Sequence, residues 1–159
     1  MVHLCIPDIE IGDYYYHGIV LRSVQPLSNG QYYIMEFELQ NEEDDSDTYE
    51  WNVYQCVVDN NTDADIYGAD MNTITGRVPL ETFGAAKRAL NELLDYLKDG
   101  NYGEYDSQIH NIFAGWADER RHRVYSKVLG KLHWRLGVNE YEGILEPGYW
   151  LTIVVEKAA

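Results

Sequence analysis

Apolar and polar residues alternate with a period of two along three stretches near the start of the chain, the pattern of half-buried β-strands. These stretches are GDYYYHGIVLRSV (12–24), QYYIMEFELQ (31–40) and TYEWNVYQCVVD (48–59). Asn29-Gly30, between the first two, is a strong signal for a two-residue hairpin turn. The three stretches together predict an antiparallel β-meander. In the second strand we expect one face inward (Tyr33, Met35, Phe37 and Leu39) and the other outward (Tyr32, Ile34, Glu36 and Glu38).

The hydrophobic period changes to three and four residues after Pro79, a residue type that suits the first turn of a helix. Apolar residues at that spacing continue up to Gly100, which predicts a long helix ending there. We expect a second helix over 104–115 and a third over 118–136, closed by Gly137. The last stretch, EPGYWLTIVVEK, is rich in β-branched and aromatic residues and predicts a closing strand. The predicted fold class is therefore α+β, an antiparallel β-meander with three helices packed on it, in the order βββααα-β.

The composition is that of a folded protein, with 159 residues and 45% hydrophobic residues, and it predicts a single domain over 1–159. No apolar run reaches the roughly 18 residues of a membrane span, and the first residues do not form a signal peptide. We therefore expect a cytoplasmic protein with no membrane partner. Cys5 and Cys56 fit that compartment as buried thiols.

The charge is strongly negative and unevenly placed. The formal net charge is −15, and residues 1–80 hold 15 acids against two bases, Arg22 and Arg77. Half of the twelve basic residues lie in one sixteen-residue stretch, RRHRVYSKVLGKLHWR, at 120–135. Such an imbalance bears on the choice of partner and says nothing about the fold.

The basic stretch has the pattern of an amphipathic helix. Four cations (Arg120, Arg123, Lys127 and Lys131) fall on one stripe with Trp134 beside them, and five apolar residues (Tyr125, Val128, Leu129, Leu132 and Leu136) fall opposite. A row of cations can follow a phosphate backbone, and an aromatic ring can stack on a base. The alternative is a solvated face that offsets the acidic strands.

The segment NEEDDSD suggests a second kind of site. Its acids are Glu42, Glu43, Asp44, Asp45 and Asp47. They could imitate phosphates and occupy a basic groove on another protein, or they could form an ordinary solvated hairpin loop.

Residues 59–70 have part of the spacing of a calcium-binding loop. Oxygen ligands at Asp59, Asn61, Asp63, Asp65 and Asp70 correspond to positions 1, 3, 5, 7 and 12. Ala64 stands at position 6, where the loop requires glycine, and Asp70 replaces the usual glutamate. Turns made by Asp and Asn in a plain loop explain the same composition.

Signals of catalysis are missing from the sequence. The five histidines show no metal-ligand spacing among themselves or with the cysteines. No glycine-rich phosphate loop and no nucleophile motif is present. We therefore expect no catalytic residues and no cofactor, and a protein that is not an enzyme.

The opening IPDIEIGDYYYHGIVLRSVQPLSNGQYYIMEFEL resembles the first hairpin of phage-type OB-fold single-stranded-DNA-binding proteins. The later segments EWNVYQCVV and PGYWLTIVV, with a helix before the second, extend the resemblance, which covers 6–58 and 124–156. It implies an OB-like, partly open barrel in which 59–120 would be an insertion. Glu36, Glu38 and Glu50 on the outer strand faces would repel a nucleic acid, so the basic helix is the better contact surface.

Two functions of different classes follow. The first is a phage or mobile-element module that binds single-stranded DNA. Its site would comprise Arg120, Arg123, Lys127, Lys131, Arg135, Trp134, Tyr32 and Tyr54. The second is an acidic nucleic-acid mimic or inhibitor that binds a basic host protein, with a virion assembly subunit as a related alternative. The oligomeric state stays open, and a phage-encoded protein would act in the host cell.

Overall fold

The computed structural model describes residues 1–41, 47–69, 77–103, 107–116, 123, 126 and 134–156. The chain divides into two compact units, the first formed by Met1–Glu38 and Tyr54–Leu93, the second by Leu39–Val53 and Leu94–Ala159. Strand β6 (Thr48–Val58) belongs to both, because its first half lies in the second unit and its last residues lie in the first.

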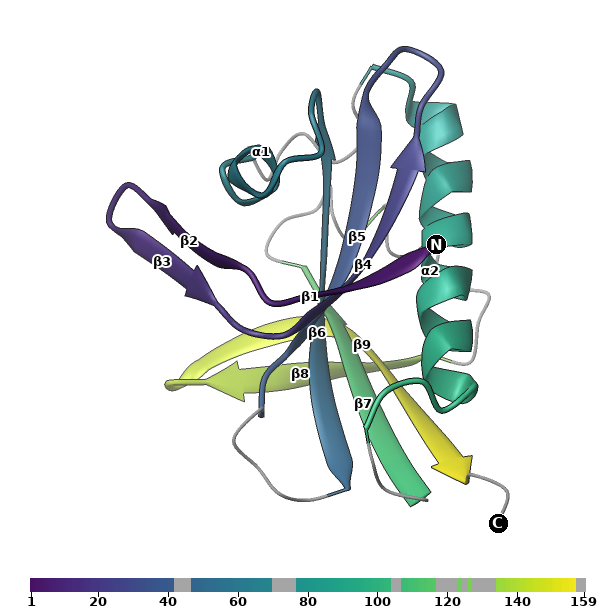
Figure 1. Ribbon diagram of the computed structural model, residues 1–159. Helices are drawn as coiled ribbons and strands as arrows, with labels where there is room; N and C mark the ends of the chain where they lie inside the picture. The colour runs from purple at the N-terminus through teal and green to yellow at the C-terminus, as the bar shows by residue number, and fades with distance from the viewer. Residues whose placement is uncertain are drawn as a thin grey trace. The chain divides into compact units, whose positions relative to one another are not determined.

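The sheet of the first unit has the order β1-β4-β5-β6 (Figure 1). β1 (Val2–Cys5), β4 (Val20–Pro26) and β5 (Tyr32–Leu39) are antiparallel neighbours. The turn between β4 and β5 confirms the hairpin predicted around Asn29-Gly30, but its loop has three residues, Ser28 to Gly30, and not two. Leu27 N donates to Gln31 O over 2.8 Å across this loop, and Gly30 has a φ of 86°.

The predicted first strand, 12–24, is interrupted. Its first part pairs instead in a separate two-stranded ribbon of β2 (Asp8–Ile11) and β3 (Tyr14–His17), and the chain leaves that ribbon at Gly18 before β4 begins. Gly12, with a φ of 60°, makes the turn of the ribbon. The alternation of YYYH is therefore that of a strand, as predicted, but a strand in another sheet.

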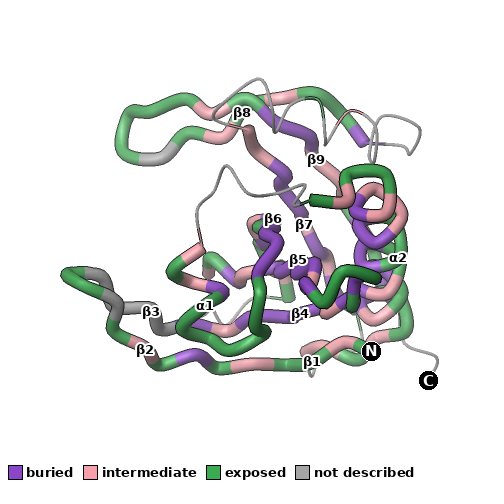
Figure 2. The backbone as a smooth tube through the Cα atoms, turned by 90° about the horizontal axis from the view of Figure 1, so that it is seen from above, coloured by how far each residue is buried: buried purple, intermediate pink, exposed green. Residues whose placement is uncertain are grey.

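Two helices lie on opposite faces of the first unit's sheet. In α2 (Pro79–Lys98), Glu92 accepts from Ser23 Oγ over 2.7 Å and Arg88 donates to Gln25 over 3.3 Å. In α1 (Asp63–Tyr67), Asp63 accepts from Arg22, which points to the other side of β4. Figure 2 shows buried stretches of β4 and β5 between these helices.

Because a helix lies on each side of the sheet, the prediction that one face of β5 points outward to solvent is wrong. Tyr33, Met35 and Phe37 are buried as predicted. Ile34 and Glu36 are also buried, at 1% and 4% exposure, because α1 covers their side of the sheet. α1 is too short to leave a periodic signal in the sequence, whereas the predicted helix from Pro79 to Gly100 is confirmed by α2.

The second unit contains a mixed sheet of order β6-β7-β9-β8. β7 (Ser107–Gly115) runs parallel to β6, and β9 (Ile144–Glu156) is antiparallel to both β7 and β8 (Arg135–Tyr141). The closing strand predicted from EPGYWLTIVVEK is confirmed by β9.

The predicted fold class, an OB-like antiparallel meander carrying three helices, is wrong. The helix expected over 104–115 is strand β7, and the helix expected over 118–136 cannot extend through Arg135, where β8 begins. The described part of the chain is mostly β-sheet, with two helices of defined bounds, only one of them longer than two turns, and with Arg123 and Ser126 as isolated described helical residues. No described helix is long and apolar enough to cross a membrane.

Three glycines lie side by side across the sheet of the second unit. Gly148 of β9 is directly opposite Gly115 of β7 and Gly137 of β8. A Cβ atom on Gly148 would meet the Phe113 ring and lie 2.7 Å from Ala114 O. The glycine row therefore leaves room for the rings of Phe113 and Trp150, whose centroids are 4.7 Å apart.

We predict that Gly148→Ala lowers the free energy of unfolding by about 1–3 kcal/mol, because the added methyl group meets a ring and a backbone oxygen that cannot both move. Urea denaturation measures the change. Gly84→Ala in α2 is the control, since its Cβ would meet only the flexible end of Arg88, and we expect it to raise stability by up to about 1 kcal/mol. Equal stability of Gly148→Ala and the parent would contradict the packing described for the glycine row.

Candidate functional site

A buried ion pair joins β4 to β5 in the first unit. Arg22 and Glu36 are direct cross-strand partners, exposed to 7% and 4%, and Arg22 Nε lies 2.7 Å from Glu36 Oε2. Arg22 Nη1 also donates to Asp63 Oδ1 over 2.8 Å, and Nη2 donates to the Tyr67 hydroxyl over 3.1 Å. Tyr67 in turn donates to Glu36 Oε2 over 3.0 Å, which closes the network.

The network fixes the ionisation of its members. Burial alone would lower the pKa of Arg22, but Glu36 and Asp63 hold it above its ordinary value. Burial raises the pKa of Glu36, and the guanidinium of Arg22 opposes that rise. Burial, aided by Glu36, raises the pKa of Tyr67, so its hydroxyl remains a neutral donor. The charge of Arg22 is therefore neutralised within the fold.

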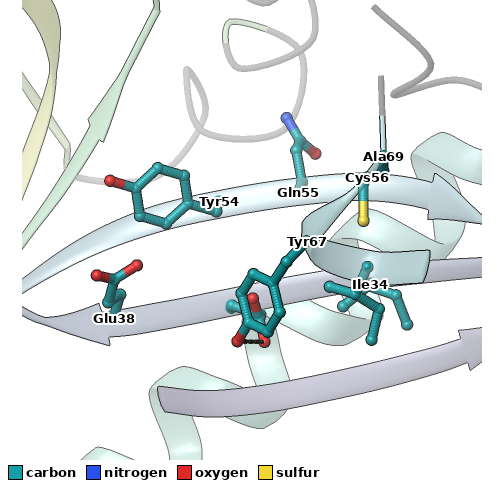
Figure 3. A pocket seen from close by; sticks show the side chains of 9 residues that line it. Ile34, Glu38, Tyr54, Gln55, Cys56, Tyr67 and Ala69 are labelled. Carbon is teal, nitrogen blue, oxygen red and sulfur yellow. Dashed lines mark hydrogen bonds between the residues drawn. The ribbon is translucent and has the colours of Figure 1, made fainter. Parts of the chain in front are cut away.

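A cavity of about 360 Å³ lies beside this network, on the side of the sheet that carries α1. It is lined by Ile34, Glu36, Glu38, Tyr54, Gln55, Cys56, Ile66, Tyr67 and Ala69. Figure 3 shows Glu38 and Tyr54 at one end, Ile34 and Cys56 at the other, and Tyr67 between them. The cavity thus has a polar end and an apolar end.

The apolar end is continuous with a small hydrophobic cluster. Ile34, Cys56, Val58 and Ile66 pack together, with Ala69 against them. Burial, together with the carboxylate of Glu36, raises the pKa of Cys56 to about 12, so at neutral pH this thiol is protonated and acts as a small apolar group. Both cysteines are free thiols as predicted, but only Cys56 is buried, whereas Cys5 is half-buried.

Gln55 belongs to the opposite side of β6. Its Oε1 accepts from the hydroxyl of Tyr33, whose side chain is on the side of the sheet covered by α2. In Figure 3 its amide points away from Cys56 and Tyr67. We therefore assign it no role in the chemistry of the cavity.

The structure describes only some of the residues predicted to contact nucleic acid. Arg120, Lys127 and Lys131 lie outside the described residues. Arg123 is helical and exposed, and Arg135 is exposed at the start of β8. Trp134 is buried at 9% exposure, so its ring is not available for stacking. Tyr32 is half-buried, and Tyr54, at 39% exposure, lines the cavity.

The acidic candidates are placed only in part. Glu42, Glu43, Asp44 and Asp45 lie outside the described residues, and Asp47 is exposed. Among the calcium candidates, Asp70 also lies outside, and Asn61 is exposed.

The calcium spacing is not realised as a loop, because helix α1 begins at Asp63 and Thr62 caps it by accepting from Asp65 N over 3.2 Å. Asp63 is bound to Arg22, and Asp59 accepts from Gln31 over 3.2 Å. In the described ranges no group of three acid, His or Cys side chains could hold a metal ion.

The ion pair was not predicted, although Arg22 and Glu36 are charged residues within two predicted neighbouring strands. The loop between the two strands has three residues, Ser28 to Gly30, and this length places Arg22 opposite Glu36; a two-residue turn at Asn29-Gly30 would have placed Arg22 opposite Phe37. A charged pair directly opposite on two otherwise apolar strands indicates a covered face. The cavity itself had no such signal, because Ile66 and Tyr67 reach it from a helix that the pattern did not predict.

The second unit contains a buried histidine with a structural role. Trp51 Nε1 donates to His110 Nδ1 over 3.1 Å, so the neutral ring carries its proton on Nε2, which donates to Gln108 Oε1 over 3.1 Å. The ring stacks on Tyr49, with 5.1 Å between centroids. Burial lowers the pKa of His110 to about 4.

Comparison with known proteins identifies no relative: no family model, no curated protein and no solved structure matches the chain. The resemblance of the opening hairpin to single-stranded-DNA-binding proteins therefore stays a prediction from the sequence.

We predict that Arg22→Met destabilises the protein by about 3–5 kcal/mol, because Glu36 is left buried without its cation. Replacing both partners, with Arg22→Met and Glu36→Leu, should recover a large part of that loss, since no uncompensated charge remains. Urea denaturation of the two single variants and the double variant gives the coupling energy. Additive losses would show that the two groups do not depend on each other.

We predict that His110 makes stability fall as the pH is lowered from about 6.5 to about 4. The unfolded state binds a proton in that window, whereas the folded state does not, so folding loses up to about 3 kcal/mol. Urea denaturation across this window should show a flatter pH dependence for His110→Gln. His3→Gln, at an exposed position, is the control. If the free energy of unfolding of His110→Gln fell with pH as steeply as that of the parent, His110 would not be the group responsible for the pH dependence.

Proposed function

We propose that the protein is a non-catalytic interaction module that binds a positively charged partner protein through the side of the first unit that carries α1. One observation supports this most directly: Arg22, the one basic residue in the sequences of β4, β5 and α1, is buried and bound to Glu36 and Asp63. Its charge is therefore hidden from any partner, while Asp65 of α1 and Glu10 of the neighbouring β2 are exposed.

Acids outnumber bases in the first unit, and α2 holds two of its exposed bases. The sequence of this unit holds eleven Asp or Glu residues against four Lys or Arg. The exposed bases Lys87 and Arg88 lie on α2, on the side of the sheet away from α1. On the α1 side, Asp65 is exposed and Glu38 is half-buried at the cavity, and β2, which packs against α1, adds exposed Glu10.

A basic protein surface suits this arrangement better than a nucleic acid. Carboxylates attract Lys and Arg side chains and steer their approach, and they repel phosphates. Tyr54 adds a partly exposed ring of the amphipathic kind that is enriched at interfaces. This is the acidic-module hypothesis of the sequence, now with α1 and the cavity as its carriers in place of the 42–47 loop alone.

Single-stranded nucleic acid is the second candidate. Arg123 and Arg135, both in the second unit and both exposed, support it. Binding there would not require the α1 side of the first unit, so one experiment can separate the two functions.

The test is fluorescence anisotropy with two labelled probes, an oligolysine peptide and an oligo-dT strand, each titrated at low and moderate salt. We expect saturable binding of oligolysine that weakens with salt, because the exposed carboxylates are screened. We expect no saturable binding of oligo-dT. Binding of oligo-dT without binding of oligolysine would establish the second candidate instead.

Two variants with the same change in net charge distinguish binding at a defined site from general attraction of a cation to an acidic protein. The first neutralises three acids of the first unit, with Glu10→Gln, Glu38→Gln and Asp65→Asn. The second neutralises three exposed acids of the second unit, with Glu140→Gln, Glu142→Gln and Glu156→Gln. We expect the first to weaken oligolysine binding about tenfold or more and the second much less. Equal weakening by both would contradict a site on the α1 side.

A further inference from the structure

The cavity of the first unit has the chemistry of a receptor for one particular group. We propose that it binds an ammonium group carried on an apolar stem, either a lysine side chain of the partner or a free alkylamine. This inference rests on the proposed function only for the first of those sources. Glu36, Glu38, Tyr54, Tyr67 and the apolar end of the cavity are its parts.

Glu36 has one carboxylate oxygen, Oε1, to which no described residue donates a hydrogen bond. Both hydrogen bonds that it accepts from described residues, from Arg22 and from Tyr67, end on Oε2. No described residue donates to Oε1, although the side chain is only 4% exposed and lines the cavity. Oε1 is not one of the polar atoms buried without a partner, so it opens on the cavity, where it can accept a hydrogen bond from the N–H group of a ligand.

The charges around the cavity select a cation. Glu36 and Glu38 line the cavity, while the guanidinium of Arg22 is bound to Glu36 and to Asp63. The excess is negative, and it acts at the edge of a partly buried site, where charge interactions are stronger than in water. A carboxylate or a phosphate would add to the repulsion, whereas an ammonium group reduces it.

The side chains that line the cavity favour a ligand with a cation at one end and a hydrocarbon stem at the other. The ring of Tyr54 stands at the polar end and that of Tyr67 lies between the two ends (Figure 3). The guanidinium of Arg22 already lies over the Tyr67 ring, 5.7 Å from its centroid, so Tyr54 is the ring for a bound cation, which gains about 0.5–2 kcal/mol over such a ring. The opposite end offers Ile34, Ile66 and the protonated thiol of Cys56. The volume, about 360 Å³, is near the lower end of the range for small-molecule sites and has room for an alkyl stem.

A metal ion fits the site less well. A hard cation requires several oxygen ligands around one point, and no such group of three exists in the described parts of the chain. The apolar end would also be left without a function. An ammonium ion on a hydrocarbon stem satisfies both ends of the cavity at once.

The experiment is an amide NMR titration of the whole protein with n-pentylamine hydrochloride, and with n-pentanol as the neutral molecule of similar shape. We expect saturable shifts with pentylamine at the amides of Glu38, Tyr54 and Tyr67, and none of these with pentanol. Absence of saturable shifts, or equal shifts with pentanol, would overturn the proposal.

Glu38→Gln keeps the size of the side chain and removes its charge. We expect it to weaken pentylamine binding about fivefold to tenfold, while Glu140→Gln, at an exposed position in the second unit, leaves binding unchanged. The same spectra show whether Glu38→Gln remains folded. If both variants bind pentylamine as the parent does, the cavity is not the site.

Oligolysine, titrated in the same way, distinguishes this inference from the proposed function. If pentylamine binds with the expected dependence on Glu38 and oligolysine does not bind, the cavity is a site for free amines and the proposed function fails. If oligolysine binds and pentylamine does not, the proposed function stands and the lysine-receptor inference fails. If both bind and both depend on Glu38, the partner presents a lysine to the cavity.

Discussion

The buried pair of Arg22 and Glu36 is the constraint on which the first unit depends. Two opposite charges on adjacent strands, both nearly inaccessible to water, require hydrogen-bonding partners on their own side of the sheet. Asp63 and Tyr67 supply them, and both belong to α1. The short helix is therefore held against the sheet mainly by polar contacts to Arg22, with Ile66 as its buried apolar contact. Because α1 covers the sheet only in part, a cavity remains beside it.

The same pair determines what the first unit presents to a partner. Had Arg22 been exposed, it would have offset the carboxylates of the α1 side. Since it is neutralised internally, those carboxylates act with little opposition on their own side of the sheet. Sequence counts alone cannot show this, because a count treats a buried and an exposed arginine alike. The burial of Arg22 therefore supports the proposal that the acidic surface on the α1 side is the working site.

The elements that the sequence predicted are those whose pattern is set by local rules. The hairpin turn at Asn29-Gly30, the period of α2 and the β-branched composition of β9 each depend on neighbouring residues. β7 was mistaken for a helix because two of its buried positions, Gln108 and His110, are polar. Its burial depends on pairing with β6, more than fifty residues earlier, which no local pattern contains. For the same reason α1 and its cavity were missed, since both exist through contacts distant in sequence.

Buried polar side chains define strand register in both units. In the first unit, a slip of β5 by one residue would turn Glu36 toward α2 and away from Arg22, and would leave two buried charges unpaired. In the second, the hydrogen bond from Trp51 of β6 to His110 of β7 requires the two strands to keep their parallel alignment. Apolar side chains alone would tolerate such slips more readily, since they lack directional partners. The polar contacts that made the sequence harder to interpret therefore help to select one register in each unit, and in the first unit they also shape the proposed binding site.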